Sequence, residues 1–167
     1  MILVCNASPL IVLAKAGLLD LLTGLCAGLR IPRSVAEEIS RINDAADPAR
    51  IWLLRNNTFV AEAPSVSPFV MAWDLGAGES SVISLVESLP GSTAVLDDLA
   101  GRRCAQAIGL PVVGTLGLIL MAKQRGLISS VRPALDSIVA AGLFISRHHI
   151  DSILTQAGES SPPPSLP

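Results

Sequence analysis

The sequence predicts an α/β protein built around a mostly parallel, doubly wound β-sheet. Short apolar segments of strand length alternate with helix-length segments along the chain, which is the pattern of βαβ units. Half of the residues are hydrophobic but only 3% are aromatic, so the core is aliphatic, as suits helices packed on a buried parallel sheet. At 167 residues the chain has the length of one domain.

The first half of the chain contains two expected strands. The apolar run "ILVC" stops at Asn6, and Ser8-Pro9 follows as a helix start, because proline is favoured at the first helical position. The elements expected here are a strand at Ile2–Cys5, helices at Leu10–Ala14 and Leu18–Leu22, a strand within Leu29–Ser34, helices at Val35–Ile42 and near Arg50–Arg55, and an extended loop at Thr58–Pro68.

The second half continues this alternation and ends in a Pro/Ser-rich stretch. The elements expected here are a helix at Glu79–Leu89, a strand at Ser92–Leu96, a helix at Leu99–Ile108, a strand at Leu110–Gly114, and helices at Thr115–Arg125, Arg132–Ala141 and Arg147–Gln156. We therefore expect one domain over residues 1–157, followed by a disordered tail over residues 158–167.

The composition argues against several classes of protein. The net charge is −2 and no long basic stripe is present, so any contact with nucleic acid must be local. The scarcity of aromatic residues argues against RNA readers that stack bases on aromatic platforms. Three cysteines without a C-x-x-C pair argue against a disulfide scaffold or zinc site and favour a reducing cytoplasm. No apolar run approaches the ~20 residues that a membrane span needs, and no positive start of a signal peptide is visible.

Two acidic residues lie on the inward side of predicted helices. Glu79 points about 35° from the centre of an apolar helix face that includes Val82 and Val86. Glu38 lies roughly 65° from the centre of another such face. A carboxylate that faces a core is costly unless it is paired, hydrogen-bonded or bound to metal. The alternatives are a charge favoured by a helix N-terminus for Glu79 and a boundary residue with its head in water for Glu38.

Polar residues also follow two of the predicted strands. Asp97 and Asp98 come after one strand; one of them can cap the next helix, and the other needs a further reason, such as a metal or ligand. Asn6 holds the equivalent place after the first strand, although Asn6 or Ser8 can instead cap the helix at Pro9. In a doubly wound fold these places meet at one crevice. Clustered oxygen ligands suit Mg²⁺ or Mn²⁺, and such ions suit phosphodiester hydrolysis.

Four segments of the chain carry a resemblance to a known family. "NASPLIVLAKAGLLDLL" is similar to an opening that normally reads Asp-Thr/Ala-Ser-Pro-Leu, "IPRSVAEEI" to a strand-to-helix segment with an acid, and "GAGESSVISLV" to a Gly-Glu helix. The longest and most specific segment is "VLDDLAGRRCAQAIGLPVVGTLGLILMAKQRGLI". Together they resemble the PIN-domain superfamily, and within it the prokaryotic PIN-like proteins related to toxin ribonucleases of toxin–antitoxin systems.

The resemblance implies a three-layer α/β/α sandwich, a Mg²⁺ or Mn²⁺ site and cleavage of single-stranded RNA. The acids that match the family's site are Glu38, Glu79 and the pair Asp97 and Asp98, and which aspartate of the pair holds metal stays open. The resemblance further implies a homodimer and, as for many members, an antitoxin protein that keeps a toxic nuclease inactive.

Asn6 departs from the family pattern, which has Asp at this position. An amide offers a carbonyl oxygen but no charge. Removing one unit charge a few ångströms from a divalent ion weakens binding by on the order of several kcal/mol at an effective dielectric near 20. Three explanations are open: a non-catalytic relative, weak metal binding through the remaining acids, or an introduced substitution that silences a toxic nuclease.

We therefore expect a metal-dependent endoribonuclease of toxin type, with Asn6 beside its acids. The alternative is a catalytically impaired PIN-like module that binds RNA or protein. Arg102 and Arg103 can contact RNA phosphates, and Ser8 and Thr115 can touch the site or phosphate; solvated helix residues and helix caps are the simpler interpretations. A nucleotide-binding regulator of flavodoxin-like shape is a third interpretation, and it predicts phosphate bound without a divalent ion.

Overall fold

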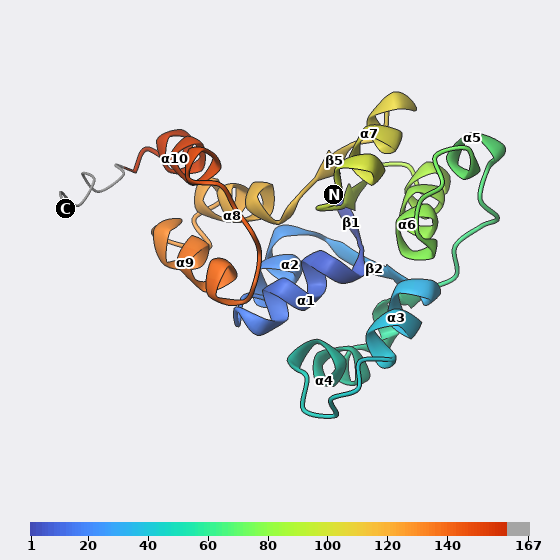
Figure 1. Ribbon diagram of the computed structural model, residues 1–167, viewed down its shortest axis with the longest axis horizontal. Helices are drawn as coiled ribbons and strands as arrows, with labels where there is room; N and C mark the ends of the chain where they lie inside the picture. The colour runs from blue at the N-terminus through green and yellow to red at the C-terminus, as the bar shows by residue number, and fades with distance from the viewer. Residues whose placement is uncertain (160–167) are drawn as a thin grey trace.

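A five-stranded parallel sheet forms the centre of the protein (Figure 1). The computed structural model describes residues 1–159. The strand order is β3-β2-β1-β4-β5, and every pair of neighbours is parallel, which confirms the predicted parallel sheet. The strands are β1 (Ile2–Cys5), β2 (Gly28–Pro32), β3 (Val60–Ala61), β4 (Ser92–Val95) and β5 (Val112–Val113).

Helices cover both faces of the sheet and give the expected three-layer α/β/α arrangement (Figure 1). Because parallel crossovers are right-handed and the winding reverses between β1 and β4, α6 and α7 cover the face opposite α1 to α4. The last three helices extend the α1 and α2 layer past β5, since α8 contacts α2, α9 contacts α1, and α10 contacts α8. The helices are α1 (Ala7–Lys15), α2 (Asp20–Leu25), α3 (Arg33–Ser40), α4 (Pro48–Arg55), α5 (Pro68–Met71), α6 (Ala77–Ser88), α7 (Leu99–Ala107), α8 (Thr115–Gln124), α9 (Arg132–Ala140) and α10 (Arg147–Gln156).

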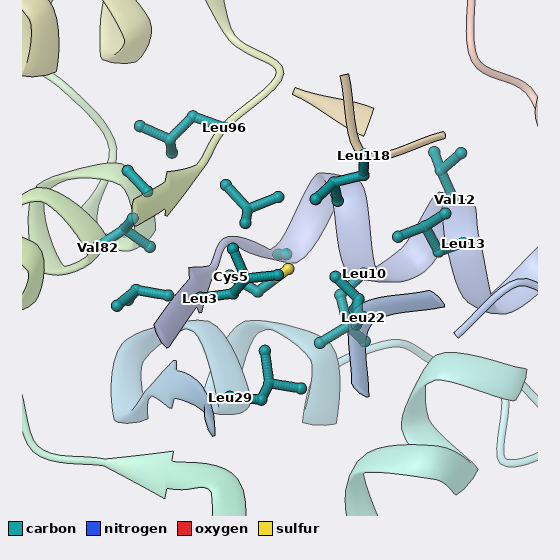
Figure 2. Close-up of a cluster of buried hydrophobic side chains, with 14 of the residues drawn as sticks. Leu3, Cys5, Leu10, Val12, Leu13, Leu22, Leu29, Val82, Leu96 and Leu118 are labelled. Atoms are coloured by element: carbon teal, nitrogen blue, oxygen red, sulfur yellow. The ribbon is translucent and has the colours of Figure 1, made fainter. Parts of the chain in front are cut away.

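The core is aliphatic and lies on both sides of β1. Leu3, Val4 and Cys5 are each 0% exposed, which explains why β1 is a continuous apolar run rather than an alternating one. Figure 2 shows Leu3 and Cys5 of β1 among leucines of α1 and α2 and side chains from the α6 and β4 side. The buried sheet therefore holds the carboxyl ends of its strands in fixed positions.

The clearest local differences from the prediction are at the start of α1 and in the loop before α6. Helix α1 begins at Ala7 rather than at Leu10, so Pro9 is its third residue and not its first. Proline is tolerated there because the first-turn amides have no acceptor within the helix. The expected loop at Thr58–Pro68 contains the two-residue strand β3, and the single-turn helix α5 begins at its last residue.

The C-terminal boundary is described only in part. Residues 160–167 of the predicted tail lie outside the described residues. Glu159 is described, and its carboxylate accepts hydrogen bonds from Ser130 Oγ and the Val131 amide at 2.7 and 2.8 Å. Glu159 is therefore tied to the domain. No helix within residues 1–159 is long and apolar enough to cross a membrane.

Candidate functional site

The carboxyl ends of β1 and β4 lie side by side at the centre of the sheet. The winding of the chain reverses between these two strands, and in open α/β sheets a ligand crevice forms at such a point. The backbone N–H of Asn6 donates a hydrogen bond to the Val95 carbonyl at 3.1 Å, which fixes the end of β1 against the end of β4. The residues that follow the two strands therefore share one crevice.

Asn6 turns its side chain into this crevice and does not cap α1. It is 3% exposed, and its side chain makes no capping hydrogen bond. Its Nδ2 instead donates to Glu79 Oε1 at 2.9 Å. Among the described residues, no group donates to its buried Oδ1. A buried carbonyl oxygen without a partner costs about 1–3 kcal/mol, so this oxygen is available to a ligand.

Glu79 comes from the first turn of α6, where a negative charge is favoured. The side chain packs against Gly101 of α7: a Cβ there would lie 3.3 Å from Glu79 Cγ. The absence of a side chain at Gly101 lets α7 approach closely enough to confine Glu79. The inward direction predicted from helical spacing is the one that the structure shows, because Glu79 reaches Asn6.

Glu38 of α3 reaches the same place from the other side. A Cβ on Gly78 would lie 2.7 Å from Asn6 Oδ1 and 3.3 Å from Glu38 Oε2, so both oxygens face this glycine. Burial, and next the negative charge of Glu79, raise the pKa of the Glu38 carboxyl above its ordinary value. Much of the side chain is exposed, so solvent weakens this effect. Two carboxylates and one unpaired carbonyl oxygen thus meet beside Gly78.

Asp97 follows β4 and is held by the N-terminus of α8. Its Oδ1 accepts a hydrogen bond from the Thr115 amide, and its Oδ2 accepts one from Thr115 Oγ1, each at 2.7 Å. Asp97 also lies near the end of β1, because it follows β4, in which Val95 is paired with Cys5 of β1. Burial, and next the charge of Asp97, raise the pKa of the Cys5 thiol far above its ordinary value. Asp97 is therefore in the crevice, with both oxygens bound to Thr115.

Asp98 has a different role from its neighbour. It is the N-cap residue of α7, and its Oδ2 accepts a hydrogen bond from the Gly101 amide at 2.9 Å. Its side chain is exposed. The structure thus explains Asp98 as a helix cap and leaves Asp97 as the aspartate that faces the crevice.

The donor set fits a hard divalent cation, although the acids do not all converge. Within residues 1–159, no three His, Cys, Asp or Glu side chains gather into a group that could hold a metal ion. The oxygens that do meet belong to Asn6, Glu38 and Glu79. Like-charged carboxylates beside an unpaired carbonyl oxygen match the all-oxygen ligands of Mg²⁺ and Mn²⁺.

The residues predicted to contact RNA differ in accessibility. Ser8 and Arg103 are exposed, and Arg102 is half-buried beside Asp97. Thr115 is 0% exposed, and its hydroxyl donates to Asp97, so it positions that carboxylate rather than offering a surface to phosphate. The sequence prediction that Thr115 can touch the site agrees with this contact, but it did not name Asp97 as the partner, and the close approach at Gly78 was not predicted. A threonine directly after a strand end, in a chain with an aspartate after the neighbouring strand, is the signal that was available.

Fold and site together define a doubly wound α/β protein with an acidic crevice at its switch point. The family model DUF3368, described as a PIN domain, matches residues 2–159. The chain therefore belongs to the PIN-domain family, whose fold is nuclease-like, and the resemblance is confirmed at that level. No curated protein matches the chain, and membership of the toxin subgroup stays a prediction.

Proposed function

We propose that this protein is a metal-dependent endoribonuclease that cleaves single-stranded RNA as the toxin of a toxin–antitoxin pair. The observation that supports this best is the unpaired Oδ1 of Asn6, which lies beside the carboxylates of Glu38 and Glu79. Three separate elements supply these groups at the switch point of the sheet. Such an arrangement is costly for folding alone and useful for holding a cation.

Each residue of the site has a definite task in this proposal. Asn6, Glu38 and Glu79 hold Mg²⁺ or Mn²⁺. When bound there, the ion would supply a lowered pKa of water and neutralisation of the charge that develops on a phosphodiester. Asp97, fixed by Thr115, adds negative charge on the β4 side of the crevice. Arg102 and Arg103 hold RNA phosphates at the mouth, and the forked guanidinium group suits that contact.

One observation favours a second candidate function. The side-chain Nδ2 of Asn6 donates a hydrogen bond to Glu79 Oε1. This oxygen therefore has a partner without an ion. The protein would then be a catalytically impaired PIN-like module that binds RNA or a protein partner. Its surface offers exposed apolar side chains for a protein partner, including Leu54 and Met71, which are 70% and 66% exposed.

Mn²⁺ binding measured by calorimetry separates the two candidates. Tight binding by both the wild type and Asn6→Asp supports a working metal site. Binding only after the substitution supports a site silenced at Asn6. If neither protein binds Mn²⁺, the nuclease proposal is wrong.

Glu38→Gln and Glu37→Gln form a matched pair for the same measurement. The two acids are neighbours on α3 and both are exposed, but Glu37 pairs with Arg41 at 3.4 Å, whereas a Glu38 oxygen faces Gly78 beside Asn6. We expect Mn²⁺ binding to fall only in Glu38→Gln. Incubation with single-stranded RNA, with and without EDTA, then tests the chemistry directly.

The remaining parts of the proposal concern partners and compartment. We infer a homodimer and an antitoxin protein, which sedimentation and co-purification from the native host can test. A reducing cytoplasm is consistent with the three cysteines, Cys5, Cys26 and Cys104, all of which are free thiols.

A further inference from the structure

A cavity of about 510 Å³ lies between β5, α8, α10 and the loop before α10. Its volume is in the range of sites that bind small molecules. Asp97 and Arg102 form part of its lining, so the cavity adjoins the carboxylate crevice.

Phe144 stands at this cavity in an unusual position. It is 95% exposed, the highest value among the large hydrophobic residues that the structure describes. Its neighbours Leu143 and Ile145 pack against the core, so the loop is anchored on both sides of the ring. A phenyl ring at the edge of a cavity offers a flat apolar face on which a planar ligand can stack.

One wall of the cavity carries hydrogen-bonding groups at helical spacing. His149, Ser152 and Gln156 lie three and four residues apart on α10, and all three line the cavity. Gln156 Nε2 donates to Ser152 Oγ at 3.1 Å, and His149 Nδ1 lies 2.8 Å from Ser146 Oγ. These contacts orient the side chains. The facing wall is apolar and includes Leu116 and Leu120 of α8.

We propose that this cavity binds one unpaired nucleobase of single-stranded RNA next to the phosphate that enters the carboxylate crevice. Phe144 stacks on the base, the polar side chains of α10 contact its edge, and Arg102 binds the adjoining phosphate. This inference rests on the proposed function and deepens it by naming where the strand is held. The low aromatic content of the chain argues against a series of stacking platforms, whereas a single ring serves a single base.

A base with its phosphate fits these groups better than a second copy of the chain does. A second copy could cover the apolar ring of Phe144, but nothing in that contact calls for the half-buried Arg102 beside Asp97. A nucleotide supplies a flat apolar face, a hydrogen-bonding edge and a negative charge together. The cavity contains a counterpart for each of the three.

The test measures binding of a fluorescein-labelled, six-nucleotide single-stranded RNA by anisotropy, in EDTA so that metal-dependent cleavage does not occur. Phe144→Ala removes the ring, Phe144→Trp keeps an aromatic ring, and Leu54→Ala is the control because Leu54 is also exposed, at 70%, on α4. We expect Phe144→Ala to bind about 5- to 100-fold more weakly and the other two to bind like the wild type. An abasic strand of the same length should bind equally to the wild type and Phe144→Ala.

Several results overturn the inference. The inference is wrong if the wild type and Phe144→Ala bind the RNA with equal affinity. It is also wrong if the wild type does not bind the RNA. A wild type that sediments as a dimer, beside a monomeric Phe144→Ala, shows that a second copy covers the ring. The proposed nuclease function fails separately: ring-dependent RNA binding without any EDTA-sensitive cleavage removes the nuclease and keeps the base site. Cleavage that is insensitive to Phe144→Ala removes the base site and keeps the nuclease.

Discussion

Asn6 Nδ2 donates a hydrogen bond to Glu79 Oε1 at 2.9 Å, across 73 positions of sequence. The bond joins the residue after β1 to the first turn of α6 and leaves Asn6 Oδ1 facing Gly78 and Glu38. A neutral amide is therefore compatible with two nearby carboxylates in the absence of an ion. An aspartate at the same place would be a third negative group.

Asn6→Asp should destabilise the protein in EDTA and make its stability respond to Mn²⁺. The substitution removes a hydrogen bond to a charged group and adds a like charge, so we expect the free energy of unfolding to fall by about 1–3 kcal/mol. Urea denaturation with and without Mn²⁺ measures both effects. Asn56→Asp is the control, because Asn56 Nδ2 donates to the Trp52 carbonyl at 2.8 Å, and no carboxylate takes part in that bond. Equal stability of Asn6→Asp and the wild type in EDTA would contradict this account.

Gly78→Ala should destabilise the protein although alanine is the better helix former. The new Cβ would lie 2.7 Å from Asn6 Oδ1, and Asn6 is buried and held by Glu79, so it has little freedom to move away. We expect a loss of about 1–3 kcal/mol in the free energy of unfolding, as for other overpacked sites.

Gly24→Ala in α2 is the matched control for this substitution. Its Cβ would meet only the flexible side chain of Leu127, at 3.2 Å. Helix propensity should then dominate and stabilise this variant by up to about 1 kcal/mol. If urea denaturation shows that both variants gain stability, the close approach at Gly78 is not as tight as the structure indicates.

The order of helices and strands is predictable from this sequence because its signals are local. The apolar runs "ILVC" and "STAV" predict strands, and the structure has β1 and β4 there. The spacing of apolar residues predicts α6 and the inward direction of Glu79. Strand β3 was not predicted, although the equally short β5 was, because Val60-Ala61 leads into a stretch rich in proline and serine that is typical of a loop. The strand exists through its pairing with β2. Helix α5 did have a signal, because Ser67-Pro68 is a cap followed by proline.

The contacts within the candidate site were less predictable than its members. The resemblance and the helical spacing both point to Glu38 and Glu79, but nothing local in the sequence says that Asn6 bonds Glu79 rather than capping α1. The pair Asp97 and Asp98 is similarly ambiguous, because both lie between β4 and α7, where no helix or strand periodicity tells neighbouring residues apart. The structure separates them through long-range and capping geometry: Asp97 meets Thr115, and Asp98 meets the start of α7.

Asp98→Ala should weaken α7 without changing Mn²⁺ binding. Loss of the cap to the Gly101 amide is expected to lower the free energy of unfolding by about 1 kcal/mol, and Asp98→Ser should restore most of it. Urea denaturation gives the stability and calorimetry the ion binding. A loss of Mn²⁺ binding in Asp98→Ser, with normal stability, would mean that Asp98 and not Asp97 serves the site.

Thr115→Val should reveal how Asp97 is held. Valine keeps the shape of threonine but leaves Asp97 Oδ2 without its hydroxyl donor in a half-buried place. The expected loss is about 1.5–3 kcal/mol in the free energy of unfolding, the range for a hydrogen bond to a charged group. Thr115→Ser keeps the hydroxyl and loses one methyl group, so it should be closer to the wild type, with a loss of about 1 kcal/mol. The opposite order in urea denaturation would show that packing, not the hydrogen bond, is the important contribution of Thr115.

Glu159 makes the stability of the C-terminal helices depend on pH. A hydrogen bond from Ser130 Oγ, and next one from the Val131 amide, lower the pKa of the Glu159 carboxyl to about 2. An unfolded glutamate has a pKa of about 4.3, so the folded state prefers the ionised form. The resulting stabilisation is present above about pH 4.3 and is lost as the pH falls toward 2.

Glu159→Gln should therefore lose less stability than the wild type between about pH 4.3 and 2, since glutamine does not titrate. The urea midpoint of both proteins, followed from pH 5 downward, measures this difference. Asp136→Asn, which removes an exposed acid on α9, is the control for the loss of a surface charge. Parallel curves for Glu159→Gln and the wild type would show that the carboxylate at the start of α9 is not bound in solution as it is in the structure. A difference confined to this pH window would instead place Glu159 within the folded domain.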